Sequence, residues 1–385
     1  MNSQAAQALI ERTRRHIAEK TSERGAPGRI AASAYLDADR LQAEQTFVLR
    51  ALPVCLGPVA AVAERGSFFT HDFSGLPLLV VRGSDDRVRV LLNACRHRGT
   101  RLISEPGGTA RVIVCPYHSW TYSLDGALRG MPHADCFAHL SGSETHLVEF
   151  PAYPRAGMVW TVLQSGDVAH NIAAALQPIL QDAVDWGYDN YVPYKRRVLR
   201  KACNWKLIVD GALETYHFQY AHTKTIAHMF FDNLLVSDVF GDHQRLMVPK
   251  REIADPEYGN ASLGEISNLI YHVFPNAVLL YEGDHANVLT VWPDGPHGCV
   301  IDGTMLIPDV PHSDKAASHW AKNYEIFWTA LEEDFALGVS IHGSLKTGLV
   351  PHVNFGATEI AALRFHARVE RRLADDARSR QMAAE

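Results

Sequence analysis

Two short segments that each combine a cysteine with a histidine constrain the folding of this chain more than any other feature. The first reads Cys95-Arg96-His97, and seventeen residues separate it from the second, Cys115-Pro116-Tyr117-His118. Two tight loops that each present a thiolate and an imidazole can enclose a small metal group, so the chain must fold to bring them together. Two groups fit these donors: a [2Fe-2S] cluster with cysteines on one iron and histidines on the other, or a structural zinc ion.

Length, composition and charge indicate what kind of protein carries this metal group. The chain has 385 residues, 47% hydrophobic and 21% charged, with a net charge of -6. This length predicts about two domains. The negative net charge argues against nucleic acid as a partner, because nucleic-acid binding needs concentrated Lys and Arg residues. The start is charged rather than built like a signal peptide, and no run approaches the length of a membrane span. We therefore expect a cytoplasmic protein, in which these Cys and His spacings favour metal binding over disulfides.

The spacing of apolar residues predicts the order of the elements. Between residues 53 and 155, short alternating runs separated by Gly, Asp, Ser and Pro predict a small antiparallel β domain. A second alternating stretch covers residues 271 to 306. Helical patterns cover residues 5–20, 32–52, 171–185, 204 onward, 318–345 and the region after 356. The fold class is therefore predicted as α+β. The predicted domains are an N-terminal helical segment (1–40) packed on the last domain, a β domain (41–158) and a larger domain (159–385).

A second group of metal-binding residue types follows the segment Asn204-Trp205-Lys206. Asp210, Glu214 and His217 have helical spacings that place them on one helix face. His222 would point about 140° away from His217 on the same helix, because each residue turns the chain by about 100°. Both histidines can therefore bind one ion only if the helix ends or distorts between them. A buried histidine with a backbone partner is the simpler alternative.

A carboxylate that could complete such a site lies in the long helix near the C-terminus. Trp320, Tyr324, Phe327, Leu331 and Asp334 follow one another at spacings of 4, 3, 4 and 3. This spacing lines them along one narrow stripe, so the acid points where the aromatic residues point. Glu332 and Glu333 fall on other faces and are predicted to be solvated. A buried carboxylate needs a partner or a metal, which favours Asp334 as a ligand.

Both groups of residues together resemble one family. The segments CRHRG and CPYHSWTYSLDG, and NWK followed by a carboxylate, Tyr-His and a second histidine five residues on, resemble the Rieske non-haem iron oxygenases, the α subunits of ring-hydroxylating dioxygenases. The resemblance extends from about Tyr35 to His366 and implies a small Rieske domain and a larger, helix-grip-like catalytic domain with an antiparallel sheet and flanking helices. It also implies an enzyme that incorporates dioxygen.

The resemblance assigns roles to individual residues. Cys95, His97, Cys115 and His118 would hold the Rieske [2Fe-2S] cluster, and His217, His222 and Asp334 would hold a mononuclear Fe(II). Glu214 matches a carboxylate that carries electrons between the two metal sites, with Asp210 as a possible support. His342 stands where relatives often have glutamine, and because two helical turns separate it from Asp334 we expect it to form hydrogen bonds near the ligands rather than to be a fourth ligand. Two further departures from the family pattern are Glu214, where many relatives have aspartate, and Gly211, where relatives often have asparagine.

Partners follow from the resemblance as well. In the family the cluster of one subunit serves the iron of its neighbour, which implies a homotrimer, with or without β subunits. Electrons would come from a separate flavin and iron-sulfur reductase, with or without a ferredoxin, because no nucleotide-binding G-x-G-x-x-G follows a strand here. O2 would be the co-substrate.

The substrate is the least constrained part of the prediction. Candidate pocket residues are mostly apolar, and each has an alternative place in the core: Leu213, Met229, Phe230, Phe231, Phe274, Leu280, Tyr281, Leu289 and Phe327. They favour hydroxylation or dihydroxylation of an aromatic or other largely apolar substrate. The alternatives are oxidative demethylation of a methoxyarene or of a quaternary amine held by aromatic rings, and a non-catalytic Rieske electron carrier.

Overall fold

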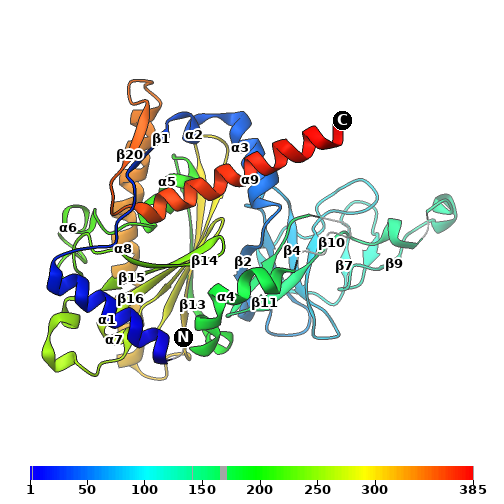
Figure 1. The fold of residues 1–385 in the computed structure, drawn as a ribbon. Helices are drawn as coiled ribbons and strands as arrows, with labels where there is room; N and C mark the ends of the chain where they lie inside the picture. Colours follow the sequence, from blue (N-terminus) through cyan, green and yellow to red (C-terminus); the bar gives the residue numbers. More distant parts are fainter. Residues whose placement is uncertain (2, 141, 165–170, 385) are drawn as a thin grey trace. The chain divides into compact units, whose positions relative to one another are not determined.

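A computed structural model describes residues 1, 3–140, 142–164 and 171–384 of the chain (Figure 1). The chain forms two compact units. One consists of Met1–Leu49 with Ala175–Glu385, and the other of Arg50–Ala174. The N-terminal segment therefore belongs to the larger unit, and the smaller unit is an insertion between its two parts.

The smaller unit is built from antiparallel strands. A five-stranded sheet has the order β10-β5-β4-β3-β6, and three-stranded sheets have the orders β11-β12-β2 and β7-β8-β9. Alternating runs such as Leu78–Arg82 and Val88–Leu92 pair with each other as β4 and β5, as the sequence predicts. The other strands are β2 (Val54–Pro58), β3 (Ser67–His71), β6 (Gly107–Thr109), β7 (Ile113–Val114), β8 (Thr121–Tyr122), β9 (Leu128–Gly130), β10 (Glu149–Phe150), β11 (Ala152–Arg155) and β12 (Met158–Thr161).

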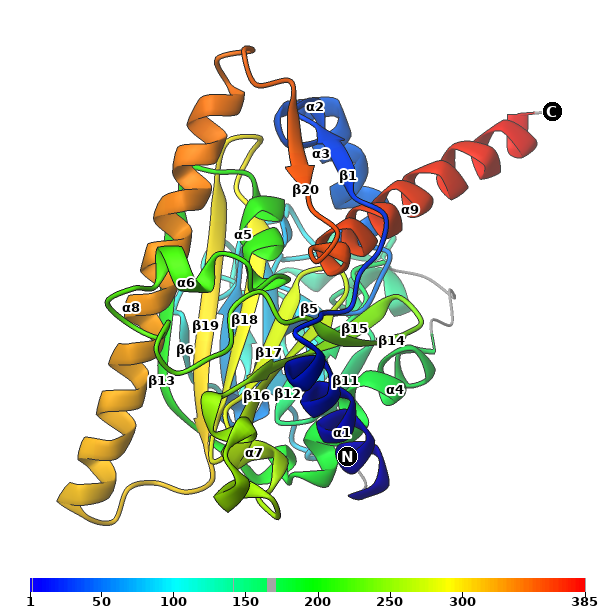
Figure 2. The same cartoon turned by 60° about the vertical axis from the view of Figure 1, so that its left-hand side comes forward.

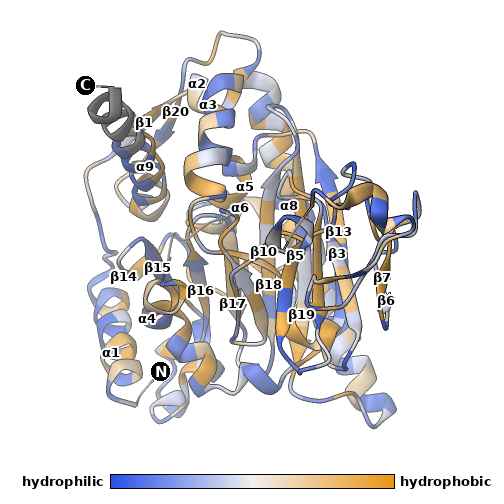
Figure 3. Ribbon diagram, turned by 90° about the vertical axis from the view of Figure 1, so that its right-hand side faces the viewer, coloured by the Kyte–Doolittle hydropathy of each residue, from blue (hydrophilic) through white to orange (hydrophobic). Residues whose placement is uncertain are grey.

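The larger unit is organised around a seven-stranded antiparallel sheet. Its order is β13-β19-β18-β17-β16-β15-β14. Every residue of β18 and β19 is buried, and β17 is mostly hydrophobic in Figure 3, so these strands form the centre of the core. The strands are β13 (Val192–Lys201), β14 (Val236–Phe240), β15 (His243–Pro249), β16 (Ser267–Val273), β17 (Ala277–Tyr281), β18 (Ala286–Pro293) and β19 (Cys299–Ile307).

Helices in this unit carry the residues that matter below. Helix α5 (Trp205–Ala212) packs on β18, and α8 (Asp314–Leu345) packs on α5 and runs alongside β13 (Figure 2). Both begin with a side-chain cap, because Asn204 accepts from the Lys206 amide and Ser313 from the Ala316 amide. The other helices are α1 (Ser3–Glu19), α2 (Ser33–Leu36), α3 (Ala38–Glu44), α4 (Ile172–Asp185), α6 (Phe218–Ala221), α7 (Leu263–Ile266) and α9 (Ile360–Ala384).

The α+β class is confirmed, and several elements differ from the prediction. The helix predicted from residue 204 onward ends at Ala212, and strands β14 and β15 follow where no strands were predicted. Strand β13 was also missed, because it lies at the sheet edge and carries five Lys and Arg residues among its ten. In the part of the chain that the structure describes, no helix is long and apolar enough to cross a membrane.

Candidate functional site

The two Cys-His loops of the smaller unit have the same backbone shape. The Cys95 amide donates to the Thr100 carbonyl and the Gly99 amide donates back to the Cys95 carbonyl, both at 2.8 Å. The Cys115 amide donates in the same way to Trp120 (2.8 Å), and Ser119 donates to Cys115 (3.0 Å). The fourth residue after each cysteine is left-handed, with φ of +74° at Gly99 and +56° at Ser119. Gly99 adopts this conformation without a steric cost, whereas Ser119 adopts it as a non-glycine residue, and both loops turn tightly around their cysteines.

The donors of the two loops converge. The Nδ1 atoms of His97 and His118 lie 3.2 Å apart, and both cysteines are buried beneath the partly exposed imidazoles. The Cys95 sulfur lies 3.3 Å from the Tyr122 hydroxyl. Burial, the largest effect, raises the pKa of the Cys95 thiol, so a thiolate there needs a metal charge beside it.

Aromatic rings hold the two imidazoles in place. The indole of Trp120 stacks on His97 with ring centroids 5.1 Å apart and planes within 8°, and the Tyr117 ring lies 3.7 Å from that of His118. Two buried sulfurs on one side and two oriented imidazoles on the other match the donor set of a Rieske cluster.

His217 and His222, the candidate metal ligands of the larger unit, lie at the two ends of one helical turn. Helix α6 covers only Phe218–Ala221, with His217 at its start and His222 at its end. The prediction that Asp210, Glu214 and His217 share one helix face is therefore wrong, because α5 has ended before Glu214. Since neither histidine is constrained by a continuous helix, their rings approach each other, with centroids 5.1 Å apart.

Asp334 of α8 lies between the two rings. Its Oδ1 is 3.3 Å from His217 Nε2 and 3.0 Å from His222 Nε2. The three residues each offer a ligand atom within 4.8 Å of the others. Asp334 Oδ1 and His217 Nε2 are both buried and, despite their proximity, are not aligned for a hydrogen bond. Donors that converge on a common point without bonding one another fit a single metal ion with two imidazoles and one carboxylate.

Carboxylates also hold the far side of each ring. Glu214 contacts Nδ1 of His217 and accepts from the His217 backbone amide at 3.1 Å. Glu333 Oε2 lies 2.7 Å from Nδ1 of His222 and accepts from the Thr225 hydroxyl at 2.7 Å. Each histidine is therefore oriented through Nδ1 and presents Nε2 to the common point.

Glu332 and Glu333 were predicted to be solvated, and they are partly exposed, with 34% and 29% of their side chains accessible, but each also binds a partner. The His222 ring lies between Glu333 and Asp334, so two adjacent residues of α8 contact its two nitrogens. Glu332 forms ion pairs with Arg197 (3.1 Å) and with Lys201 on β13. Helical spacing describes directions around one axis, and it cannot show that a ring from another segment lies between two neighbouring faces.

The charges of this site attract a cation. Burial opposes protonation of His217, but Asp334 and Glu214 outweigh it and raise the pKa of His217 to about 10. Burial also opposes ionisation of Asp334, but the two histidines outweigh it and lower the pKa of that carboxyl. The arrangement therefore stabilises positive charge at the common point, whether this is carried by protons or by a metal ion.

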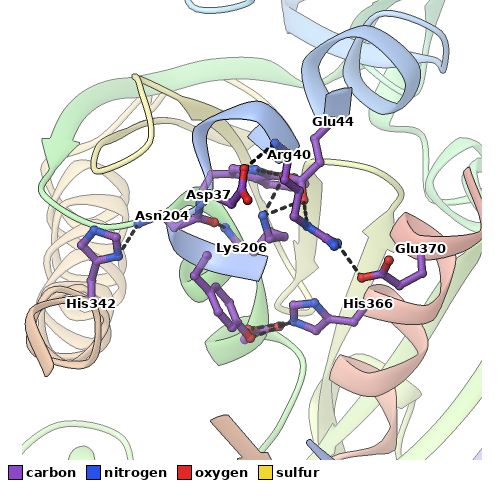
Figure 4. Close-up of polar contacts among 11 residues, drawn as sticks. Asp37, Arg40, Glu44, Asn204, Lys206, His342, His366 and Glu370 are labelled. Atoms are coloured by element: carbon purple, nitrogen blue, oxygen red, sulfur yellow. Dashed lines mark hydrogen bonds and ion pairs between the residues drawn. The ribbon is translucent and has the colours of Figure 1, made fainter. Parts of the chain in front are cut away.

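Two residues with predicted supporting roles instead anchor the scaffold. Asp210 accepts from the Tyr35 hydroxyl at 2.8 Å and lies 2.9 Å from Nε2 of His366. His342 contacts the backbone amide of Asn204 at the start of α5 at 3.4 Å (Figure 4). Its Nε2 also lies 3.2 Å from the His297 ring.

The adjacent buried ion pair has a similar anchoring role. The Lys206 ammonium lies 2.6 Å from Glu44, which also binds Arg40 (2.9 Å), and Arg40 reaches Glu370 on α9 (2.6 Å) (Figure 4). These contacts fix α5 against α3 and α9, and so fix the direction in which the chain leaves α5 toward Glu214.

A pocket of about 960 Å³ of empty space, including its open mouth, lies beside the three ligands. Most of its lining is apolar and comes from α8, the segment around α6, and strands β15 to β18. Its residues are Gly211, Ala212, Glu214, His217, Phe218, His222, Ile226, Met229, Phe230, Val248, Asn268, Ile270, Val278, Leu280, Glu282, Leu289, Asn323, Ile326, Phe327, Ala330, Leu331 and Asp334.

Five of the predicted pocket residues line this space: Met229, Phe230, Leu280, Leu289 and Phe327. The other four lie elsewhere. Leu213 is fully buried, and Phe231 borders a different surface hollow. Phe274 packs against Phe365, and Tyr281 stacks on Trp186 with centroids 3.9 Å apart. Alternation along β17 would have separated Leu280 from Tyr281, because neighbouring strand residues face opposite sides of the sheet.

Comparison with known proteins identifies both units. Residues 53–151 match the model of the Rieske [2Fe-2S] domain, and residues 188–375 match that of the ring-hydroxylating α subunit catalytic domain. The chain belongs to the Rieske oxygenase α-subunit family. The family match therefore identifies the cofactors as a Rieske [2Fe-2S] cluster and a mononuclear non-haem iron, and it excludes the zinc alternative.

Curated relatives include enzymes of two substrate classes. The Rieske oxygenase is 29% identical to the glycine betaine monooxygenase oxygenase subunit of Pseudomonas aeruginosa UCBPP-PA14 (54% of this chain, 49% of the relative). It is 29% identical to the carnitine monooxygenase oxygenase subunit of Escherichia coli K12 (50% and 52%) and 27% identical to the benzene 1,2-dioxygenase α subunit of Pseudomonas putida (70% and 58%). The match thus spans about half the length of the first two relatives.

Solved structures show the same fold. The quaternary ammonium Rieske monooxygenase in complex with L-carnitine superimposes with a TM-score of 0.76 at 18% identity, over 89% of this Rieske oxygenase and 95% of the other chain. Naphthalene 1,2-dioxygenase from Rhodococcus sp. bound to indole gives a TM-score of 0.73 at 17% identity, over 97% and 99%.

Proposed function

We propose that this chain is the terminal oxygenase component of an enzyme that uses O2, and electrons from a separate NAD(P)H reductase system, to oxidise a largely apolar organic substrate. The observation that carries the proposal is the position of the three convergent ligands in the wall of an apolar pocket. A substrate in this pocket lies beside the metal and is separated from water by aliphatic and aromatic side chains.

The residue assignments follow from the donor geometry. His217, His222 and Asp334 hold the mononuclear iron, and Cys95, His97, Cys115 and His118 hold the cluster. When bound, an iron with two histidines and one carboxylate on one face supplies oxygen activation at its remaining positions. The chain contributes ligand orientation: Glu214 and Glu333 keep Nδ1 of each ring occupied, so that Nε2 is the nitrogen that binds.

Replacement of Asp334 tests the proposal. We expect Asp334→Ala to lose bound iron and substrate-dependent oxygen uptake while keeping the absorbance of the cluster, since the cluster residues lie in the other unit. The matched control is Glu325→Ala, an exposed carboxylate on the same helix. Unchanged oxygen uptake in Asp334→Ala, measured with a surrogate reductase, would contradict the assignment of the ligands.

Glu214 is the proposed connection between the two metal sites. Its carboxylate contacts a ligand ring and also lines the pocket edge, with 13% of its side chain exposed. In a homotrimer a carboxylate at this position can contact a cluster histidine of the neighbouring subunit, and a reductase, with or without a ferredoxin, can supply that cluster.

The corresponding variant separates electron transfer from metal binding. Glu214→Gln removes the charge but keeps the size of the side chain, so we expect both metals to be bound when Fe(II) is supplied in excess, while turnover slows. Single-turnover oxidation of the reduced cluster measures the step directly. Equal rates of cluster oxidation in the variant and the wild type would show that Glu214 does not bridge the two metal sites.

The pocket discriminates among possible substrates. None of its lining residues, all of which the structure describes, is Lys or Arg, whereas Glu214 and Glu282 are acidic. The carboxylate of a zwitterion such as carnitine would therefore be buried without a cationic partner, which is costly. This favours hydroxylation or dihydroxylation of a largely apolar substrate that carries no carboxylate.

Oxidative demethylation of an amine that lacks a carboxylate is the second candidate. Phe218, Phe230 and Phe327 line the pocket and present ring surfaces that attract an alkylammonium group. Two of the relatives are monooxygenases of quaternary amines. Mass analysis of products from methylated amines and from arenes, at matched oxygen consumption, decides between the two reactions.

A further inference from the structure

The end of the pocket that is remote from the iron ligands differs in chemistry from the rest. Val278, Leu280 and Glu282 alternate along β17 and its end, and all three line the pocket. Val278 also borders a small adjoining cavity together with Asp334, so this end of β17 is the end near the metal. Glu282 lies four residues further along, or about 13 Å at the rise of a β-strand.

Helix α8 places Glu282 at the same end. The turn after β17 contacts the first part of α8, because Asp284 lies 2.8 Å from His319 and the His285 ring lies 5.7 Å from that of Trp320. Asp334 is fourteen residues beyond Trp320 on this helix, which corresponds to about 21 Å along its axis. The pocket is therefore elongated, with the ligands at one end and Glu282 at the other.

One oxygen of Glu282 accepts no hydrogen bond from the described residues, although the His285 ring lies within ion-pair distance of it. Glu282 Oε1 accepts from the Asn287 side-chain amide at 2.7 Å, which holds the carboxylate in place. Its Oε2 is 3.5 Å from Nε2 of His285, too far for a good hydrogen bond, and that imidazole lies closer to Asp284 at 2.7 Å. Lys250 interacts with Glu282 only at longer range, since its ammonium donates to the Gly264 carbonyl at 2.9 Å.

An unpaired acceptor lies beside this carboxylate. Leu269 pairs with Tyr281 across β16 and β17, so Asn268 and Glu282 are the next pair in register and share a sheet face. Asn268 also lines the pocket, and its side-chain Oδ1 is buried without a hydrogen-bond partner. A buried acceptor without a donor is costly, and a ligand that brings an N–H group removes this cost.

We propose that Glu282 and Asn268 form a specificity site for a protonated amine, and that the preferred substrate carries an N–H-bearing ammonium group on the order of 10 Å from the carbon that is oxidised. This inference rests on the proposed function, because it assumes that the pocket is the substrate site. A carboxylate and an amide oxygen accept hydrogen bonds from such a group, while the apolar middle of the pocket covers the connecting hydrocarbon. A quaternary ammonium offers the charge but no N–H to Asn268.

Three ligands with the same phenylbutyl skeleton test the inference by binding alone. They are 4-phenylbutylamine, its N,N,N-trimethyl derivative and pentylbenzene, in which a methyl group replaces the ammonium. Affinity is measured by equilibrium dialysis on protein that carries its cluster and iron, without reductase. We expect the amine to bind at least about tenfold more tightly than pentylbenzene, with the trimethyl compound between them, because a hydrogen bond to a charged group contributes a factor of this size.

Two variants locate the preference. Glu282→Gln should bring the amine to within about twofold of pentylbenzene, and Asn268→Leu should weaken the amine several-fold while leaving the trimethyl compound unchanged. Glu257→Gln, an exposed carboxylate outside the pocket, is the matched control and should keep the wild-type preference. Cluster absorbance shows that each variant is folded, and Asn268→Leu tests the site independently if Glu282→Gln is unstable.

Two outcomes overturn the inference. One is equal binding of amine and pentylbenzene by the wild-type protein, including no binding of either. The other is an amine preference that persists in both variants. Neither outcome depends on turnover, so the inference can fail while Asp334→Ala still supports the oxygenase. Conversely, an amine preference would persist if the proposed oxidation failed.

Discussion

Each histidine of the proposed iron site has two ring nitrogens that contact different carboxylates. Nε2 of His222 faces Asp334 while Nδ1 faces Glu333, and His217 divides its nitrogens between Asp334 and Glu214 in the same way. The sequence predicted the three ligand types, because their chemistry is local. It missed Glu333, because that role depends on a ring contributed by a segment more than a hundred residues away.

The adjacent glutamates of α8 provide a matched pair of variants. Glu333→Gln removes the charge that orients His222, so we expect iron affinity to fall by about 10- to 100-fold, as is typical for such outer partners. Glu332→Gln instead affects ion pairs with Arg197 and Lys201 and should leave iron affinity unchanged. Titration of the iron-free protein with Fe(II) measures both. Equal affinities for the two variants would show that Glu333 does not orient the ligand.

The elements differ in how well their own sequences determine them. The long helix α8 was predicted because its apolar stripe recurs over many turns. The end of α5 was not, because nothing in the helical pattern breaks there. Glu214 accepts hydrogen bonds from the Tyr216 and His217 amides, and these local bonds compete with continuation of the helix.

Packing of α8 on the sheet depends on a position without a side chain. A Cβ on Gly303 of β19 would lie 2.6 Å from the Trp328 ring of α8 and 2.7 Å from Leu289, a pocket residue. We expect Gly303→Ala to destabilise the folded state by about 1–3 kcal/mol, the usual effect of overpacking. Denaturant unfolding measures the loss.

The control for this substitution is Gly343, which lies in α8. A Cβ on Gly343 meets nothing within 4 Å, and Gly343→Ala should stabilise the helix by about 0.5–1 kcal/mol, because alanine is the better helix former. Destabilisation of both variants by the same amount would show that contact with Trp328 is not the cause.

For the molecule as a whole, two buried histidines make stability depend on pH. Burial lowers the pKa of His272 to about 3 and that of His243 to about 4. The unfolded chain protonates them near pH 6.5, so between this pH and about 4 it binds more protons than the folded chain. Stability is therefore full above pH 6.5 and falls as the pH decreases, by about 2 kcal/mol for each histidine at pH 5.

Denaturant midpoints of the iron-loaded protein at pH 7 and pH 5 check this prediction, since iron-bound imidazoles do not take up protons. His272→Gln should reduce the difference between the two midpoints. The exposed His312 provides the control, and His312→Gln should leave the difference unchanged. A midpoint at pH 5 equal to that at pH 7 would contradict the linkage.

By itself, the sequence predicted the candidate metal donors, and it determined the antiparallel β character of the cluster unit and the long helix that carries Asp334. These features depend on residue type and on short spacings, both of which can be read directly from the sequence. Only the tertiary structure decided that His217 and His222 flank a single helical turn, that Glu333 orients one of them, and that Glu282 and Asn268 lie at the far end of the pocket. Each of these depends on contacts between segments far apart in the chain, where packing and strand register, rather than local periodicity, determine which side chains meet.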